Sequence, residues 1–356
     1  MEHNIELFYP FVPDEAILEV SKVLRTKWIG QGAKVDQFEK DFEKLFNIKH
    51  AVTLNSGTAA LETAYDLLGL KSGDEVISTP LTCTASNLPL MARGVKIVWA
   101  DILEDTLTLD PKDVQSKITD KTKAIVNVHL GGVVSDLGKM PVPIVSDACQ
   151  ALGAFVGDYT CCSFQAIKHI TTGDGGMLIT ENDEDYKKAK LMRWFGIDRE
   201  KKIVNNWKAY KQRRMTFDIE VQGYKRQMTD IAATMGIVGL KHYDSMLKHR
   251  LNLFNIYKYR LRNMPDVKII NGDRNYCWLM TILVEHRDDF TKMLFENSID
   301  SNLVQVRNDI YKIFGGKRAN LPVMNKIEDK YLSIPLGMHV SEDDVNYICD
   351  VIKKGW

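Results

Sequence analysis

The feature that most constrains the fold is an alternation, between residues 51 and 180, of short apolar runs with segments of helical spacing. Runs rich in β-branched residues occupy 51–55, 75–79, 96–101, 123–130 and 142–148, and helix-like segments occupy 56–70 and 84–94. Such a pattern is typical of parallel strands joined by crossover helices. Two further strands are expected at 160–164 and 175–180, on either side of a loop that carries Lys168. We therefore predict an α/β fold with a mostly parallel central sheet.

The flanking segments have a different character. Amphipathic helices are expected at 13–26 and 36–46, and a long helical segment at 228–263 is expected to lead from one domain to the next. After it come a strand-like run, a helix and a closing helix, at 278–284, 288–298 and 341–356. A chain of 356 residues exceeds the roughly 250–300 residues at which a single core stops growing. We expect a large domain over 1–245 and a smaller C-terminal α+β domain over 246–356.

The composition excludes several classes of protein. Lys+Arg and Asp+Glu both number 47, so the charge balance indicates neither a nucleic acid nor a membrane surface as partner. The first residues have no signal-peptide pattern, and no run approaches the ~18 apolar residues of a membrane span. The six cysteines lack CxxC spacing, so we expect reduced thiols, no metal site and a cytoplasmic protein.

Lys168 is the first candidate for chemistry. It lies in SFQAIKHITTGDGG, with no acidic residue within five positions on either side. A lysine without charged neighbours can be desolvated, which lowers its pKa and leaves a nucleophilic amine that forms Schiff bases with carbonyl compounds. The alternative at this point is an ordinary lysine on an exposed loop.

Two other segments complete a recognisable set. Ser56, Gly57 and Thr58 follow a strand and open a helix, where free N–H groups bind an anion, although a plain helix cap is the alternative. Asp147 follows an apolar strand, and its carboxylate either pairs with a cation or faces solvent. A phosphate anchor, a partner for a ring nitrogen and a Schiff-base lysine are what pyridoxal phosphate requires. A nicotinamide enzyme is disfavoured because no GxGxxG fingerprint follows a strand.

The segments NSGTAAL, SDACQALGA, SFQAIKHITTGDGG, GYKRQMTDIAA and LSIPLGMHVSEDDV resemble those of the DegT/StrS family of sugar aminotransferases, over about residues 8–354. The resemblance implies the fold type I, aspartate aminotransferase-like architecture, with helices on both faces of the sheet. It also implies a homodimer whose active sites lie at the subunit interface.

The resemblance assigns roles residue by residue. Lys168 would bind pyridoxal 5'-phosphate covalently and move the proton, and Asp147 would keep the ring nitrogen protonated. Gln150 would contact the ring hydroxyl. Ser163 and the backbone of Gly57, Thr58 and Ala59 would hold the phosphate.

This chain departs from the family pattern in places. Leu81 and Thr82 fill the region where many members have an aromatic residue that stacks on the ring, so no stacking residue is assigned. Lys225 stands where many members have an asparagine that reaches the phosphate of the neighbouring subunit. Arg307 either contacts a nucleotide phosphate of the substrate or is an ordinary surface arginine.

For three aromatic residues near these segments, a structural role is weighed against a functional one. His169 is expected to be a packing or hydrogen-bonding neighbour of Lys168, and Trp28 is expected in the core. His129 either lines the pocket or merely ends a strand.

The expected function is transfer of an amino group from L-glutamate to a nucleotide-linked keto sugar, with dTDP-4-keto-6-deoxyglucose as the preferred substrate and a 4-amino-4,6-dideoxy sugar as product. Amination at C3 and a GDP-perosamine-type synthase remain open. Less favoured alternatives are a pyridoxal phosphate-dependent sugar dehydratase, in which histidine replaces the lysine, and a non-catalytic binding protein.

Overall fold

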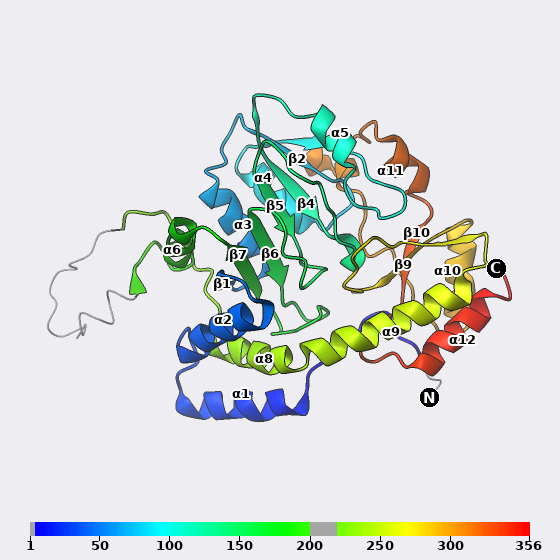
Figure 1. Cartoon of the computed structure of the whole chain (residues 1–356), viewed down its shortest axis with the longest axis horizontal. Helices are drawn as coiled ribbons and strands as arrows, with labels where there is room; N and C mark the ends of the chain where they lie inside the picture. The colour runs from blue at the N-terminus through cyan, green and yellow to red at the C-terminus, as the bar shows by residue number, and fades with distance from the viewer. Residues whose placement is uncertain (1–3, 200–218) are drawn as a thin grey trace, which may run out of the picture.

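The computed structural model describes residues 4–199 and 219–356. A seven-stranded sheet forms its centre, in the order β1-β7-β6-β5-β4-β2-β3 (Figure 1). The strands are β1 (His50–Leu54), β2 (Glu75–Ser78), β3 (Lys96–Trp99), β4 (Thr122–Val128), β5 (Ile144–Asp147), β6 (Tyr159–Ser163) and β7 (Gly176–Thr180). The pairs β2/β3, β2/β4, β4/β5 and β5/β6 are parallel, whereas β7 runs antiparallel to β6 and β1. The predicted mostly parallel α/β sheet is confirmed, and β7 is reversed because no crossover helix separates it from β6.

Both faces of this sheet are covered by helices. Cys161 and Cys162 are adjacent on β6, yet they belong to hydrophobic clusters on opposite faces because strand side chains alternate. The cluster around Cys161 includes α3 (Gly57–Leu67) and Leu90 of α4 (Thr84–Ala92). The cluster around Cys162 includes residues of α2 (Ala33–Phe46) and α8 (Asp230–Lys241). Burial on both faces explains why the strands read as continuous apolar runs.

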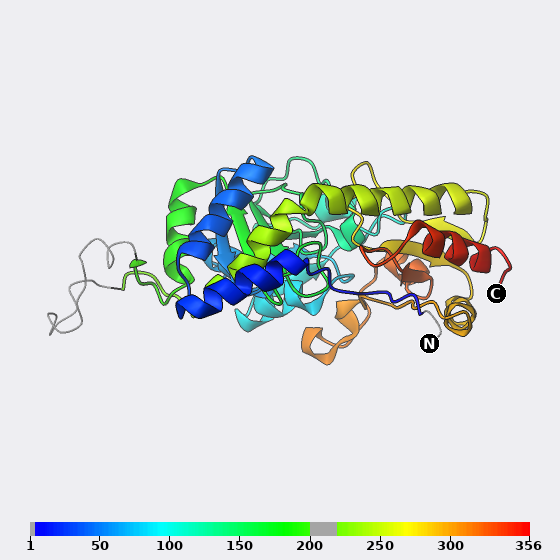
Figure 2. The same cartoon turned by 90° about the horizontal axis from the view of Figure 1, so that it is seen from below.

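A second, antiparallel sheet lies toward the C-terminus, in the order β10-β9-β8. Its strands are β8 (Val267–Ile269), β9 (Met280–Val284) and β10 (Tyr331–Ile334), and they share a hydrophobic core with α9 (Tyr243–Leu261), α10 (Arg287–Glu296) and α12 (Glu342–Ile352). Ile5 belongs to this core, and its N–H donates to the carbonyl of Ser298 at 2.9 Å. The N-terminal segment therefore runs back along the molecule to its C-terminal end (Figure 2).

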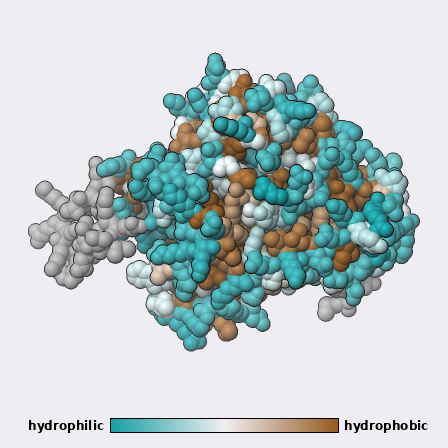
Figure 3. Space-filling model, in the orientation of Figure 1, coloured by the Kyte–Doolittle hydropathy of each residue, from teal (hydrophilic) through white to brown (hydrophobic). Residues whose placement is uncertain are grey.

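The helical segment expected at 228–263 is two helices, α8 and α9, which meet at His242. The predicted domain boundary at 245/246 falls inside α9 and stays a prediction. The remaining elements of the described ranges are α1 (Asp14–Thr26), α5 (Pro111–Ser116), α6 (Asp183–Met192), α11 (Pro322–Ile327) and the short 3-10 turns Leu130–Gly132, Asn308–Ile310 and Lys312–Phe314. Figure 3 shows a largely hydrophilic face with hydrophobic residues gathered toward its middle. Within the described ranges, no helix combines the length and the apolarity that a membrane span needs.

Candidate active site

The candidate residues gather at one edge of the large sheet. Strands β2 to β6 are parallel, and β1 runs in the same direction as β6 because both are antiparallel to β7. Their carboxyl ends therefore meet at one edge, which is where open α/β sheets bind ligands. The residues at or just after these ends are Ser56 and Gly57, Cys83 and Ser86, His129, Asp147, and Ser163.

Asp147 ends β5 and is buried, with 5% of its surface exposed, so the solvent-facing alternative is wrong. Its Oδ2 accepts a hydrogen bond from Ser86 Oγ at 2.6 Å, and its Oδ1 accepts one from the backbone N–H of Cys149 at 3.1 Å. Ser86 Oγ also lies 2.8 Å from Thr82 Oγ1. The hydroxyl chain from Thr82 through Ser86 fixes the orientation of a buried carboxylate, whose burial would otherwise be costly.

Lys168 is only partly exposed, as the predicted nucleophilic role requires. Burial lowers the pKa of Lys168 below its ordinary value, and nearby Cys149, Asp147 and Cys83 oppose that shift. The Nζ atom lies 4.0 Å from the ring centre of Trp278. The amine therefore sits against an aromatic face and close enough to Asp147 for their charges to interact, and burial, the largest influence, favours loss of its proton.

The residues predicted to hold a phosphate lie where α3 begins. Ser56 caps this helix, since its Oγ accepts a hydrogen bond from Ala59 N–H at 3.0 Å. The hydroxyl thus has the capping role, while the first N–H groups of α3 point toward the sheet edge. A Cβ atom added to Gly57 would lie 2.8 Å from Ser163 Cβ and 2.9 Å from Cys149 Sγ. Only glycine lets the start of α3 approach Ser163 this closely, so Ser163 and Gly57 lie side by side.

Gln150 and Lys225 lie beside this group. Gln150 is buried, and its Oε1 accepts a hydrogen bond from Gly131 N–H at 2.7 Å. Lys225 is exposed, and its Nζ lies 5.6 Å from the ring centre of Trp194. Its backbone carbonyl lies 3.5 Å from Asn55 Nδ2, next to the β1–α3 turn of the same chain.

The structure changes the interpretation of Arg307. The residue is 2% exposed, and its guanidinium bonds both oxygens of Asp309, at 2.8 and 2.7 Å, and Glu328 Oε2 at 2.7 Å. The alternative that Arg307 is an ordinary surface arginine is therefore wrong. We do not propose Arg307 as a substrate-binding residue, because Asp309 and Glu328 already accept hydrogen bonds from its guanidinium. The segment still lies near the site, since Asn308 Nδ2 donates to the carbonyl of Thr82 at 2.7 Å.

The structure also tests what the sequence predicts for Trp28 and for the segment 81–83. Trp28 was expected in the core but is 66% exposed. Leu81 is fully buried in a hydrophobic cluster and Thr82 is bonded to Ser86, so within the segment 81–83 the exposed residue is Cys83. Cys83 also lies near enough to Lys168 to influence its pKa.

His129 and His169, the two histidines near the predicted site residues, are both buried. His169 donates a hydrogen bond from Nε2–H to the carbonyl oxygen of Tyr276 at 2.8 Å, so the hydrogen-bonding interpretation is confirmed, and burial lowers its pKa to about 3. His129 directly follows β4, and its Nδ1 accepts from Ser135 N–H at 3.0 Å. Burial lowers the pKa of His129 to about 3, with Arg274 contributing.

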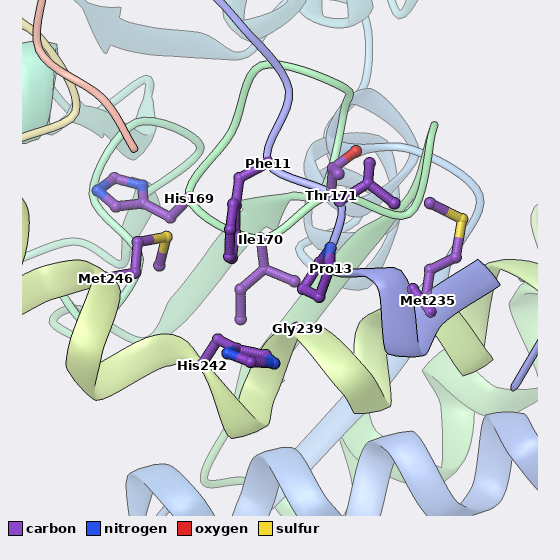
Figure 4. A pocket seen from close by; sticks show the side chains of 11 residues that line it. Phe11, Pro13, His169, Ile170, Thr171, Met235, Gly239, His242 and Met246 are labelled. Carbon is purple, nitrogen blue, oxygen red and sulfur yellow. The ribbon is translucent and has the colours of Figure 1, made fainter. Parts of the chain in front are cut away.

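A small pocket lies beside the lysine segment (Figure 4), lined by Phe11, Val12, Pro13, Ala16, His169, Ile170, Thr171, Met235, Gly239, His242 and Met246. Neither Lys168 nor Asp147 lines it, so it is not the site described above. In the part of the chain that the structure describes, no cluster of three or more His, Cys, Asp or Glu side chains is placed to hold a metal ion.

Ser86 and Trp278 were missed by sequence reasoning. Ser86 lies 61 positions from Asp147, and its one signal was a small hydroxyl residue near the start of a weak helix. Trp278 contacts the lysine segment from the second sheet's side of the molecule, and no local pattern indicates that contact.

Comparisons with known proteins agree with this geometry. Residues 12–353 match the model of the DegT/DnrJ/EryC1/StrS aminotransferase family. The chain is 31% identical to the spore coat polysaccharide biosynthesis protein SpsC of Bacillus subtilis, over 99% of this chain and 97% of that protein. It is 28% identical to the GDP-perosamine synthase of Vibrio cholerae, over 92% of each.

Among solved structures, Spr1654 from Streptococcus pneumoniae in its PLP-form superposes with a TM-score of 0.88 at 27% identity, over 99% of this chain and 98% of that one. The fold type I architecture is therefore confirmed, with its mostly parallel sheet between helices. The chain belongs to the DegT/DnrJ/EryC1/StrS aminotransferase family and is an aminotransferase.

Proposed function

We propose that this chain transfers an amino group from L-glutamate to the keto group of a nucleotide-linked sugar, with pyridoxal 5'-phosphate as its cofactor. The observation that carries the proposal is the buried Asp147–Ser86 pair, at the same sheet edge as Lys168, whose pKa burial lowers. When bound, the cofactor would supply an aldehyde that takes up the amino group of the donor and later gives it to the acceptor, and a ring that withdraws electrons from the reacting bonds.

The residues present fit this cofactor. Asp147, held in place by Ser86 and by Cys149 N–H, would accept the proton-bearing ring nitrogen as its hydrogen-bond partner. Gln150 Oε1 accepts a hydrogen bond from Gly131 N–H, so the amide NH₂ of Gln150 remains as a donor for another group. A ring hydroxyl oxygen is a suitable acceptor for that donor.

Lys168 would have two tasks. Its amine would hold the cofactor between turnovers, which requires a neutral nitrogen, and burial, which lowers the pKa of Lys168, favours that form. When the donor or acceptor takes its place, the freed Nζ moves a proton to or from the carbon that gains or loses the amino group.

The phosphate would lie at the start of α3. The N–H groups of Gly57 and Thr58 are among the first in this helix and have no partner within it, and the helix dipole favours an anion there. Ser163 Oγ lies beside Gly57 and adds a hydroxyl donor. Ala59 N–H is already bonded to Ser56 Oγ, so its contribution is to fix the turn.

The sugar nucleotide is the finer part of the proposal. We favour dTDP-4-keto-6-deoxyglucose, which would give a 4-amino-4,6-dideoxy sugar. The similarity to GDP-perosamine synthases supports a GDP-linked 4-keto sugar equally, and amination at C3 is the third possibility. The presence of Lys168 disfavours a dehydratase, because those relatives replace this lysine with histidine.

We further propose a homodimer with shared active sites. Large apolar side chains of α1 and of the segment after it are exposed, namely Ile17, Leu18, Leu24, Trp28 and Ile29. A second copy of the chain would remove this surface from water. Lys225, exposed next to the β1–α3 turn, would then contribute its charge to a phosphate at the interface.

The test of the function uses purified protein, pyridoxal phosphate and L-glutamate with a panel of dTDP- and GDP-linked 3-keto and 4-keto sugars. We expect one sugar to yield an amino sugar and an equal amount of 2-oxoglutarate, detected by mass spectrometry. Loss of a sugar hydroxyl without consumption of glutamate would point to the dehydratase, and no product from any sugar would contradict the proposal.

A further inference from the structure

Trp278 holds the lysine segment at two points. The residue is 2% exposed and precedes β9. Its indole Nε1 donates a hydrogen bond to the carbonyl of Ile167 at 2.9 Å, and the centre of the same ring lies 4.0 Å from Nζ of Lys168. One side chain therefore contacts both the backbone before the lysine and the lysine amine itself.

The indole is itself fixed in place. Trp278 N–H donates to the carbonyl of Gly131 at 3.0 Å, and Gly131 N–H in turn donates to Gln150 Oε1 at 2.7 Å. The carbonyl of Trp278 accepts from Arg250 Nη1 at 2.9 Å, and the ring of Phe8 packs 5.7 Å from the indole. The surface that meets Lys168 is thus rigid, and it is tied to the sheet edge that carries Gln150.

The contact between Trp278 and Lys168 favours the protonated form of the lysine amine. An ammonium group is attracted to the face of an aromatic ring, and tryptophan is the strongest of the aromatic partners. Burial acts in the opposite direction on Lys168, because removing an ammonium from water is unfavourable. The indole face offsets part of that cost without placing a carboxylate in the way of a bound carbonyl compound.

We propose that Trp278 is a positioning residue, which holds the free amine of Lys168 against its ring whenever that amine is not covalently engaged. This inference rests on the proposed function, because it is aminotransfer that frees the amine of Lys168 once in every half-reaction. Trp278 would keep the freed side chain in one place, at the sheet edge, instead of leaving a flexible four-carbon chain to search for the reacting carbon.

The test uses the full-length, cofactor-free protein with its lysines converted to ¹³C-dimethyllysine, which keeps the positive charge. Lys168→Arg identifies the signal by its disappearance. We expect the Lys168 methyl signal to be shifted upfield by the indole ring current, to lose that shift in Trp278→Leu and to keep part of it in Trp278→Phe. Phe8→Leu is the matched control, because it removes packing from the same indole without removing the ring that faces Lys168.

A Lys168 signal at the same position in the wild type and in Trp278→Leu overturns the proposal, and so does an equal loss of the shift in Phe8→Leu. If Trp278→Leu fails to fold, a pH titration of the wild-type protein decides. Measured against free dimethyllysine in the same protonation state, the upfield shift should diminish as the amine loses its proton and with it the attraction to the ring, and a difference that persists unchanged through deprotonation overturns the proposal. Because these experiments need neither cofactor nor sugar, they can fail while the proposed function holds, and the reverse.

Discussion

Ser86→Ala is the most informative single substitution, because Ser86 acts on the proposed chemistry only through Asp147. The mutation removes the 2.6 Å bond from Ser86 Oγ to Asp147 Oδ2 and leaves the carboxylate with the Cys149 N–H at 3.1 Å. A hydrogen bond to a charged group contributes about 1.5–3 kcal/mol. If that bond serves to hold the carboxylate for the ring nitrogen, its loss lowers kcat/KM by about tenfold to 150-fold, at about 1.4 kcal/mol per factor of ten.

The chain offers a matched control in Ser146→Ala. Ser146 precedes Asp147 on β5 and is fully buried, and its Oγ has no hydrogen-bond partner among the described residues. Removing this hydroxyl should leave the rate of the glutamate half-reaction close to that of the wild type. The assay is single-turnover absorbance of the cofactor after mixing with glutamate, at saturating pyridoxal phosphate. Equal rates for Ser86→Ala and Ser146→Ala would refute the idea that Ser86 orients the catalytic carboxylate.

Three further predictions follow from the same geometry. Lys168→Ala should abolish aminotransfer but still bind pyridoxal phosphate noncovalently, as measured by equilibrium dialysis and the coupled assay; turnover in the variant would contradict the role of Lys168. A mixture of Lys168→Ala and Lys225→Ala subunits should regain activity if Lys225 serves the partner's site, whereas no recovery would favour a contact within its own chain. The free energy of unfolding should fall as the pH drops below about 6.5, by up to about 1.4 kcal/mol per pH unit for each of His129 and His169, because the unfolded state takes up protons that the folded state refuses down to a pKa of about 3. Urea titrations at pH 7, 6 and 5 measure that slope, and His169→Gln should reduce it; an unchanged slope would contradict the burial argument.

The parts of the site that sequence could predict are those with a local signature. Asp147 and Ser163 end strands that read as apolar runs, and Gly57 opens a helix directly after a strand. Parallel strands bring their carboxyl ends together wherever they lie in the chain, so the residues that follow these strands lie at one edge of the sheet. Lys168 was predicted from its uncharged neighbours.

The parts that sequence could not predict depend on packing between distant segments. Ser86 reaches Asp147 only because α4 follows β2 at the same sheet edge, and Trp278 reaches Lys168 only because the second sheet packs against the large one. Arg307 illustrates the opposite error. Asp309, two positions later, forms two hydrogen bonds with the guanidinium and made burial possible, and Glu328 from a later segment completed the charge compensation.

The helix expected at 228–263 shows a limit of periodicity. Apolar spacing continues from α8 into α9, although the helix is interrupted at His242. Residues of α8 and the first turn of α9, Tyr243 and Met246, belong to one hydrophobic core, whereas α9 from Leu253 onward belongs to the other. Spacing alone carries no information about which core a residue faces.

The central claim is that Lys168 holds pyridoxal phosphate and releases it to an amino donor, and the visible absorption spectrum of the purified protein tests this most directly. With pyridoxal phosphate added, we expect a yellow lysine-bound form whose band disappears when glutamate is mixed in, and no such band in Lys168→Ala. A protein that stays colourless with added cofactor, or a yellow band that glutamate leaves unchanged and that Lys168→Ala retains, would contradict the claim.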